Sequence, residues 1–282
     1  MMMGNLERRE PSLLAASRTS NYDMVKRILE SRSGMTKRRP LKRRNTGLTI
    51  RSTEINNLGG TVNINYQDKY GNTSLYWSCR MGNVDITRTL LAEPDIDPNL
   101  STESRPTPLG ISCQEEGHID CVKLLLQHPA IDPNIGGMNG AVPLITASRY
   151  GQDQVFKLLL THPKTDPNAG GLRGASPLIS TCRSENLQCT RFLLDHPLTD
   201  IDYQDNQAKT ALMWASQLGY RDIVKLLLQR GADWELRNVW DQTALSLAEW
   251  NKHSDTVHLI QRFMIIDKWK AAVPRKETSK PR

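Results

Sequence analysis

Long apolar runs are missing from this sequence, and so are the common signals for export or lipid attachment. No stretch reaches the roughly 18 apolar residues that a membrane-spanning helix needs. The opening residues, MMMGNLERREP, contain no hydrophobic segment typical of a secretory signal peptide. Gly4 does not directly follow an initiating Met, and the Ser or Thr of a myristoylation signal is absent. We therefore expect a protein that makes no contact with a membrane.

The short motifs of common enzyme classes are also absent. The sequence has no GxxxxGK[ST] loop for phosphates, no HExxH pair for zinc and no GxSxG turn for a serine nucleophile. Ser, His and Asp residues occur, but scattered residues do not define a catalytic triad. The sequence therefore predicts a protein that is not an enzyme and that uses no cofactor, no metal and no small-molecule substrate.

An excess of positive charge is confined to the two ends of the chain. The net charge is +7, yet residues 1–51 carry 13 Lys/Arg against 4 Asp/Glu, and residues 268–282 carry 6 against 1. The residues between them carry 18 Lys/Arg against 25 Asp/Glu, a net charge of −7. A general affinity for nucleic acid is therefore not predicted for the middle of the chain.

The middle of the chain contains a repeat with a period of about 33 residues. Residues 143–168 (PLITASRYGQDQVFKLLLTHPKTDPN) match residues 177–202, which lie 34 positions further on. Residues 108–134 match both segments once one extra residue is allowed beside Glu116. A fixed period of this length is typical of proteins built from stacked structural units.

Each unit predicts two short helices. Pro143 suits the first turn of a helix, and Gly151 suits its end because glycine adopts positive φ readily. Leu144 and Ala147 share one face of this first helix, and Pro163 ends the unit. A second apolar stripe follows at helical spacing: Val155, Leu158 and Leu159. Two helices this short cannot bury their apolar faces alone, so neighbouring units must stack into an all-α solenoid.

The recurring pattern G-x-T-P-L-x-x-A-(x)3-G-(x)4-V-x-x-L-L resembles the ankyrin repeat, in which a β-turn finger precedes a helix pair. The best matches are Thr107-Pro108-Leu109, Pro143-Leu144, Pro177-Leu178, and Thr210-Ala211-Leu212 with Gly219. The resemblance covers roughly four-fifths of the chain. In three units His-Pro-x-x-Asp replaces the Gly-Ala-Asp that is usual in the family, and this HPxxDPN pattern is similar to fungal and other microbial ankyrin repeat proteins.

The resemblance implies about seven repeats and five segments in the chain. Terminal repeats are expected to be atypical because they cap the stack. We predict a polar tail at 1–10, a degenerate N-terminal capping unit at 11–34, a basic flexible insertion at 35–60, six units at 61–267 and a basic tail at 268–282. The last of the six units is a C-terminal cap, with Lys252 at the usual glycine position.

The five cysteines fall at two recurring positions of the repeat. Cys79, Cys113 and Cys182 share one small-residue position, and Cys121 and Cys189 share a medium-sized apolar position. Equivalent positions in neighbouring repeats lie roughly 8–10 Å apart, beyond the roughly 7 Å that a disulfide spans. No CxxC pair occurs, although a disulfide within one repeat stays open. We predict buried free thiols and a reducing compartment, the cytoplasm, the nucleus or both.

Three histidines recur at one position, at the predicted ends of second helices: His128, His162 and His196. The spacing of the repeats keeps them too far apart to bind one metal ion. We expect their imidazoles to contact free carbonyl groups at the helix ends.

The resemblance also implies a binding surface, because ankyrin repeats usually bind partners in a concave groove and at the finger tips. The positions that would face the groove are those two and three residues after the core residue of the first helix. They hold Arg80, Met81, Glu115, Arg149, Tyr150, Arg183, Leu218 and Trp250. The finger tips hold Tyr70, Met138, Arg173 and Trp240. Arg and Tyr are enriched at binding hot spots, and Arg pairs well with carboxylates, so we hypothesise that the groove binds an acidic or phosphorylated protein segment. The alternative is an ordinary solvated surface.

Six of the eight residues at positions 37–44 are basic: Lys37, Arg38, Arg39, Lys42, Arg43 and Arg44. Such a run is typical of a nuclear-import signal or of a patch that binds an anionic surface. It is equally typical of a solvated charged loop, and both interpretations stay open.

The favoured function is a non-enzymatic adaptor, scaffold or regulator that binds another protein. One alternative is a nuclear regulator that contacts nucleic acid through its basic segments. The other is an accessory or scaffold protein of a multi-enzyme biosynthetic pathway.

Overall fold

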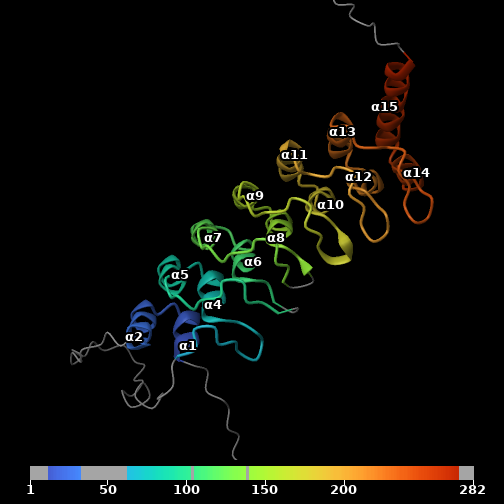
Figure 1. Cartoon of the computed structure of the whole chain (residues 1–282). Helices are drawn as coiled ribbons and strands as arrows, with labels where there is room; N and C mark the ends of the chain where they lie inside the picture. The colour runs from blue at the N-terminus through green and yellow to red at the C-terminus, as the bar shows by residue number, and fades with distance from the viewer. Residues whose placement is uncertain (1–11, 33–61, 103–104, 138–139, 273–282) are drawn as a thin grey trace, which may run out of the picture. The chain divides into compact units, whose positions relative to one another are not determined.

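The computed structural model describes residues 12–32, 62–102, 105–137 and 140–272 (Figure 1). Within these residues the regular structure is helical, apart from an isolated β-bridge between Thr102 and Arg105. The all-α prediction is therefore confirmed. The basic run at 37–44 and the finger residue Met138 lie outside the described residues, so the predictions for them stay predictions. The chain divides into two compact units, residues 1–138 and 139–282.

The described part of the first unit contains three helix pairs. They are α1 (Ser12–Arg18) with α2 (Tyr22–Arg32), α4 (Ser74–Arg80) with α5 (Val84–Leu91), and α6 (Pro108–Ser112) with α7 (Ile119–Leu126). In Figure 1 the first helices of the pairs form one row and the second helices form another. The two rows bury their facing apolar side chains, among them Leu75, Leu90 and Leu125.

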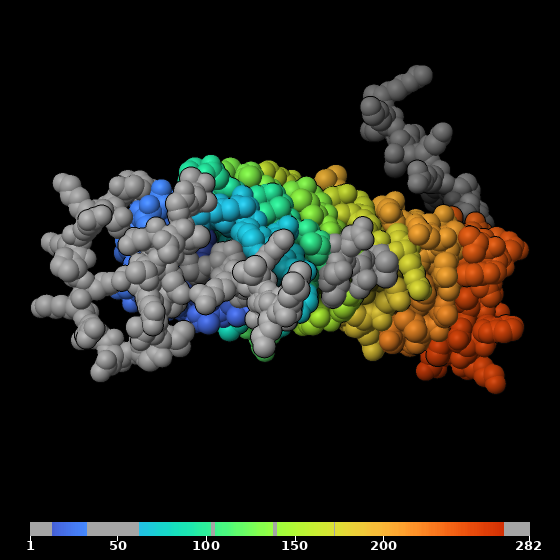
Figure 2. Space-filling model, turned by 90° about the horizontal axis from the view of Figure 1, so that it is seen from below, coloured from blue at the N-terminus to red at the C-terminus, as the bar shows by residue number. Residues whose placement is uncertain are grey.

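The described part of the second unit contains four helix pairs and one short 3-10 helix, η2 (Leu172–Gly174). The pairs are α8 (Pro143–Arg149) with α9 (Asp153–Leu160), α10 (Pro177–Arg183) with α11 (Leu187–Asp195), α12 (Ala211–Leu218) with α13 (Arg221–Gln229), and α14 (Ala244–Trp250) with α15 (Ser254–Ala272). The space-filling view shows the colours of this unit following one another in sequence order (Figure 2). Each repeat therefore packs on its neighbours in the chain, as expected for stacked units.

Most of the first helices begin with the same hydrogen bond. A Thr or Ser precedes the helix, and its side-chain oxygen accepts the backbone N–H three residues on, which satisfies a donor that the helix leaves free. These residues are Thr73, Thr107, Ser176, Thr210 and Thr243. Val142 at the start of α8 is an exception, but Pro143 follows it in the first turn, as predicted.

An Asp or Asn organises three of the loops that precede first helices, which we call the fingers. Asp68 Oδ1 accepts the N–H groups of Tyr70 and Asn72 at 2.8 and 2.9 Å. Asp205 Oδ1 makes the equivalent bonds to Gln207 and Lys209. Asn238 has the same role in the last finger, toward Trp240 and Gln242. In each finger the side-chain oxygen thus satisfies two backbone N–H groups of the turn.

Three asparagines at equivalent positions, Asn65 and the Asn99 and Asn168 of DPN segments, each join one repeat to the next one in its unit. Asn99 Nδ2 donates to the carbonyl of Ala130 at 2.7 Å, and Asn99 Oδ1 accepts the N–H of Asp132 at 2.9 Å. Asn65 makes the same two bonds in the first unit, and Asn168 makes them in the second. We call this series of side-chain amides the asparagine ladder. The asparagine of the HPxxDPN pattern therefore connects neighbouring repeats through hydrogen bonds.

The histidines of this segment differ from the expectation. The Nδ1 atoms of His128, His162 and His196 accept a backbone N–H two residues further along the chain, at 3.3–3.4 Å. The rings therefore accept hydrogen bonds within the turn, whereas we expected them to contact helix-end carbonyls. The reason is local: the turn places the N–H, not a carbonyl, within reach of Nδ1.

The last helix also differs from the predicted boundary. The array was expected to end at residue 267, but α15 continues to Ala272. Residues 268–272 contain no Gly or Pro, so nothing stops the helix there.

Candidate functional site

The structure places the predicted groove residues at the C-terminal ends of first helices. Arg80, Arg149 and Arg183 are the last residues of α4, α8 and α10, and all three are exposed. The first unit contains Tyr70, Arg80, Met81 and Glu115, and the second contains Arg149, Tyr150, Arg173, Arg183, Leu218, Trp240 and Trp250. All of these residues are exposed. They are therefore accessible, and their role in binding stays a prediction.

Large apolar side chains are exposed mainly at these positions. The described residues include 11 exposed large hydrophobic side chains. Seven lie on fingers or at first-helix ends: Tyr70, Met81, Tyr150, Leu218, Val239, Trp240 and Trp250. Trp250 is the extreme case, since 80% of its surface is exposed. Val239 was not predicted, although it adjoins Trp240 at the tip of the last finger.

A cluster of cationic and aromatic groups lies in the second unit, and we call it the Trp214 cluster. The guanidinium carbon of Arg183 lies 4.6 Å from the centre of the Trp214 ring, and the ammonium of Lys209 lies 4.3 Å from the same ring. Lys209 Nζ is also 5.4 Å from the Trp240 ring and donates to Gln217 Oε1 at 2.8 Å. Cations at these distances are attracted to the electron-rich faces of aromatic rings.

Lys209 is unusual because a lysine is rarely buried without a carboxylate partner. Only 6% of its surface is exposed. Burial lowers the pKa of Lys209, and the charge of Arg183 adds to this effect, while Asp205 opposes it. Asp205 binds the indole N–H of Trp214 through Oδ2 at 2.8 Å. The cluster therefore contains two positive groups around one ring and a single carboxylate.

The first unit has a related but weaker arrangement around Trp77. The guanidinium carbons of Arg80 and Arg18 lie 5.6 and 6.0 Å from the Trp77 ring centre. The finger residue Asp68 matches Asp205, but Asn72 stands where the second unit has Lys209. Burial alone would raise the pKa of Asp68, yet hydrogen bonds from the side chain and backbone of Asn72 outweigh it and lower the pKa. A neutral amide thus replaces the buried cation.

Lys209 and Trp214 were not predicted as site residues. A signal was present, because Trp77 and Trp214 occupy the same position of their repeats, one residue before the small core residue of the first helix. The burial of Lys209 carried no such signal, since it depends on the indole rings that two different repeats contribute.

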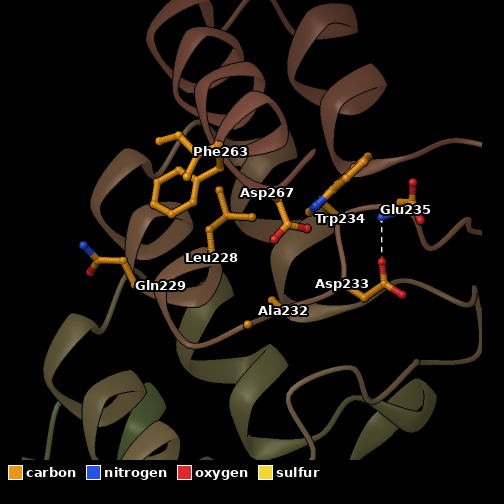
Figure 3. Close-up of a pocket in the computed structure, with 10 residues that line it drawn as sticks. Leu228, Gln229, Ala232, Asp233, Trp234, Glu235, Phe263 and Asp267 are labelled. Atoms are coloured by element: carbon orange, nitrogen blue, oxygen red, sulfur yellow. Dashed lines mark hydrogen bonds between the residues drawn. The ribbon is translucent and has the colours of Figure 1, made fainter. Parts of the chain in front are cut away.

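An open pocket of about 570 Å³ lies between α13 and α15. Figure 3 shows Leu228 and Phe263 at one end of it and Asp233 at the other, with Asp233 Oδ1 accepting the N–H of Glu235 at 2.8 Å. Its charged groups, Asp233, Glu235 and Asp267, are all exposed. The pocket therefore has apolar side chains at one end and exposed acidic groups at the other, and no buried charged group lines it.

The cysteines are buried and free, as predicted. Burial raises the pKa of Cys79 and of Cys182 to about 12, so neither thiol ionises near neutral pH. In the described residues no three His, Cys, Asp or Glu side chains are grouped so that they could hold a metal ion. None of the described helices combines the length and the apolar character needed to cross a bilayer.

Comparisons with known proteins agree with this architecture. A family model described as ankyrin repeats (3 copies) matches residues 7–136, 95–171 and 144–238. Over 42 residues the chain is 48% identical to osteoclast-stimulating factor 1 of Danio rerio, a match that covers 15% of this chain and only 20% of that protein.

Two solved structures resemble most of the chain. The ankyrin repeat domain of Bcl-3, described as a unique member of the IkappaB protein family, is 20% identical with a TM-score of 0.70, and the match covers 90% of this chain and 99% of that one. The ankyrin repeat domain of human ASB11 is 23% identical with a TM-score of 0.65, over 89% of this chain and 97% of that one. At these identities the likeness establishes the fold alone.

Proposed function

Because the chain belongs to the ankyrin repeat family, we propose that it is a protein–protein interaction module that works as an adaptor, scaffold or regulator. Its binding surface consists of the first-helix ends and the fingers. The mechanism is stoichiometric binding without catalysis, so the protein changes where its partner is or what the partner contacts.

The observation that carries this proposal is the concentration of exposed large apolar side chains at the fingers and first-helix ends. Exposed apolar groups that gather on one kind of surface commonly mark interaction sites, whereas single ones are ordinary. Trp, Tyr and Arg are also the residue types that dominate binding energy at interfaces. Trp240, Trp250 and Tyr150 combine both properties in the second unit, and Arg183 is an exposed arginine in the same unit.

A pull-down with mass spectrometry tests the proposal. The bait is the full chain as wild type, as the double variant Trp240→Ala and Trp250→Ala, and as the triple variant Arg80→Ala, Arg149→Ala and Arg183→Ala. All five side chains are exposed, so the variants should keep the helical circular dichroism of the wild type. We expect a specific partner that the wild type retains and that the Trp variant loses.

The matched control is the double variant Tyr22→Ala and Leu198→Ala. These side chains are also large, apolar and exposed, but they lie outside the finger tips and the first-helix ends: Tyr22 is the first residue of α2, and Leu198 follows the end of α11. The control should retain the partner. If the Trp and Arg variants both retain every partner of the wild type, the proposed surface is wrong.

A further inference from the structure

We propose that the Trp214 cluster recognises one carboxylate of the partner, an Asp or Glu side chain flanked by apolar residues. This inference rests on the proposed function and adds the chemistry of the bound segment. The site is built by Arg183 from α10, Lys209 from a finger, and Trp214 and Gln217 from α12.

The first argument is that the charge of Lys209 lacks a direct ion pair. Only 6% of the residue is exposed, Asp205 acts on its charge without forming an ion pair, and the hydrogen bond that its ammonium donates goes to the neutral Oε1 of Gln217. Within the described residues neither Lys209 nor Arg183 forms an ion pair with a carboxylate. A largely buried cation without a direct ion pair is costly, and a carboxylate that arrives beside Lys209 and the exposed Arg183 would reduce that cost.

The second argument is that Asp205 is already occupied. Its Oδ2 accepts the indole N–H of Trp214, and its Oδ1 accepts the N–H groups of Gln207 and Lys209. These bonds hold the carboxylate in the finger turn, where it orients the ring. Two positive groups therefore stand against one negative group, which leaves an excess of one positive charge.

This charge balance favours a carboxylate over a phosphate. A carboxylate brings one negative charge, which matches the excess. A phosphorylated side chain brings nearly two at neutral pH, and the second would be repelled by Asp205. The exposed guanidinium of Arg183 can bind both oxygens of a carboxylate, a geometry for which arginine is suited.

The third argument is the apolar surface around the cluster. Trp240, whose ring contacts Lys209, is 56% exposed, and Leu218, at the end of the same helix as Trp214, is 38% exposed. These side chains offer contacts for residues on either side of the bound Asp or Glu. A segment with both a carboxylate and apolar neighbours would therefore gain more than a purely acidic one.

A peptide array tests the inference on the full chain. Each peptide of a randomised set is synthesised in three forms, with Glu, Gln or phosphoserine at its central position and varied residues around it. The proteins are the wild type, Arg183→Gln and Lys209→Met, and the matched control is Arg191→Gln, an exposed arginine on the second helix α11. Lys209→Met keeps an apolar side chain of similar length and removes the charge, so this variant should fold. Arg183→Gln changes an exposed side chain and should also fold.

For the wild type we expect a set of peptides with apolar flanks that bind about tenfold more tightly with Glu than with Gln, since hydrogen bonds to charged groups are the stronger ones. In Arg183→Gln and Lys209→Met the ratio of the affinities for the Glu and Gln peptides should fall toward one, whereas Arg191→Gln should leave this ratio unchanged. As a second readout, the indole N–H resonance of Trp214 should shift when the best Glu peptide is added and not with its Gln counterpart.

Three results would overturn the inference: no peptide bound with a preference for Glu, a preference for phosphoserine over Glu, or a Glu preference that survives both cluster variants. If peptides bind equally with Glu and Gln but lose binding in the Trp240→Ala and Trp250→Ala variant, the proposed function stands and the carboxylate site is wrong. If the Trp variant and the triple Arg variant both retain every partner of the wild type in the pull-down, the binding surface of the proposed function is itself wrong.

Discussion

At the scale of single residues, the position in the repeat sets the backbone conformation, whichever side chain occupies it. The junction between the two helices of a repeat requires positive φ, which Gly82 and Gly219 adopt at 63° and 76°. Glu185 and Lys252 stand at the same junction with φ of 57° and 62°. A residue with a Cβ is strained in this region by roughly 1–2 kcal/mol, so the fold carries a local cost at these two repeats.

Lys252→Gly should stabilise the protein. Glycine removes the strain at φ 62°, and its greater freedom in the unfolded chain offsets part of the gain. We expect the free energy of unfolding in urea to rise by about 0.5–1 kcal/mol. The control is Lys225→Gly within α13, which should lower it by about 1 kcal/mol because glycine disfavours a helix interior. If Lys252→Gly and Lys225→Gly lower the free energy of unfolding by the same amount, Lys252 is not strained.

The five thiols should be inert in the folded protein. All are buried, and burial raises the pKa of each, to about 12 for Cys79 and Cys182, so thiolate is scarce at neutral or mildly basic pH. We expect mass spectrometry to find almost no alkylation by iodoacetamide at pH 8 under native conditions and five modifications in denaturant. Rapid native modification of any one of them would show that its repeat opens locally.

At the scale of elements, the asparagine ladder and the caps join helices whose own length provides little stability. Asn65, Asn99 and Asn168 each donate to one carbonyl and accept one N–H of the next repeat. The next position of the ladder holds Asp202, which accepts the N–H of Asp233 at 2.9 Å but has no N–H to donate. Burial raises the pKa of Asp202. The hydrogen bond from the backbone N–H of Asp233 lowers it, but the negative charges of Asp233 and Asp200 raise it further, so the net effect is a raised pKa.

Asp202→Asn should complete the ladder. By analogy with Asn99, the new amide would donate to the carbonyl of Gly231, and the repulsion among the three carboxylates would fall. We expect a gain of about 1 kcal/mol in the free energy of unfolding at pH 7. The reverse change, Asn99→Asp, removes the bond to Ala130 and should lower the free energy of unfolding by a similar amount. Equal stability of both variants and the wild type would mean that the ladder contributes nothing.

The gain from Asp202→Asn should also depend on pH. Because the folded-state pKa of Asp202 is raised, its ionised form destabilises the fold, fully so above that pKa. The penalty disappears as the pH falls through the folded pKa toward the unfolded value of about 3.9. Urea unfolding at a series of pH values should therefore show the advantage of Asn shrinking between pH 7 and about pH 4. An advantage that is constant with pH would assign the gain to the hydrogen bond alone.

At the scale of the whole molecule, stability comes from contacts between neighbours in the chain. Helix contacts in the second unit run from one pair to the next, as between α10 and α12 or α12 and α14. Repeat arrays of this kind are stable when a few units stack, because each interface contributes separately. The proposed binding surface is also built repeat by repeat, because each repeat contributes one finger and one first-helix end to it.

Residues 139–282 expressed alone should therefore fold. We expect helical circular dichroism and a cooperative urea transition, with a lower free energy of unfolding than the full chain because fewer interfaces contribute. If this fragment lacks a cooperative transition, the second unit depends on residues 1–138, and the division into two compact units does not reflect folding.

Much of the fold could be predicted from local signals. Pro143 and Gly151 mark the start and end of α8, and the recurring positions of Cys79 and Cys182 placed both thiols in the core. These predictions succeed because capping, positive φ and apolar periodicity depend on residues that are close in the sequence. The histidines of the HPxxDPN segment were predicted at the helix ends, but their hydrogen-bond partner was wrong. The turn brings the backbone N–H two residues further on to Nδ1, in place of a helix-end carbonyl.

The sequence by itself determined the repeat, the helix pairs, the buried cysteines and the family. Only the tertiary structure decided that Lys209 is buried between Trp214 and Trp240 and that Asp205 orients the Trp214 ring. It also decided that Asn99 and its equivalents bind the following repeat. The physical reason is that burial and charge pairing depend on which repeats face each other across a few ångströms, and the period of a sequence places repeats in order without specifying which side chains meet.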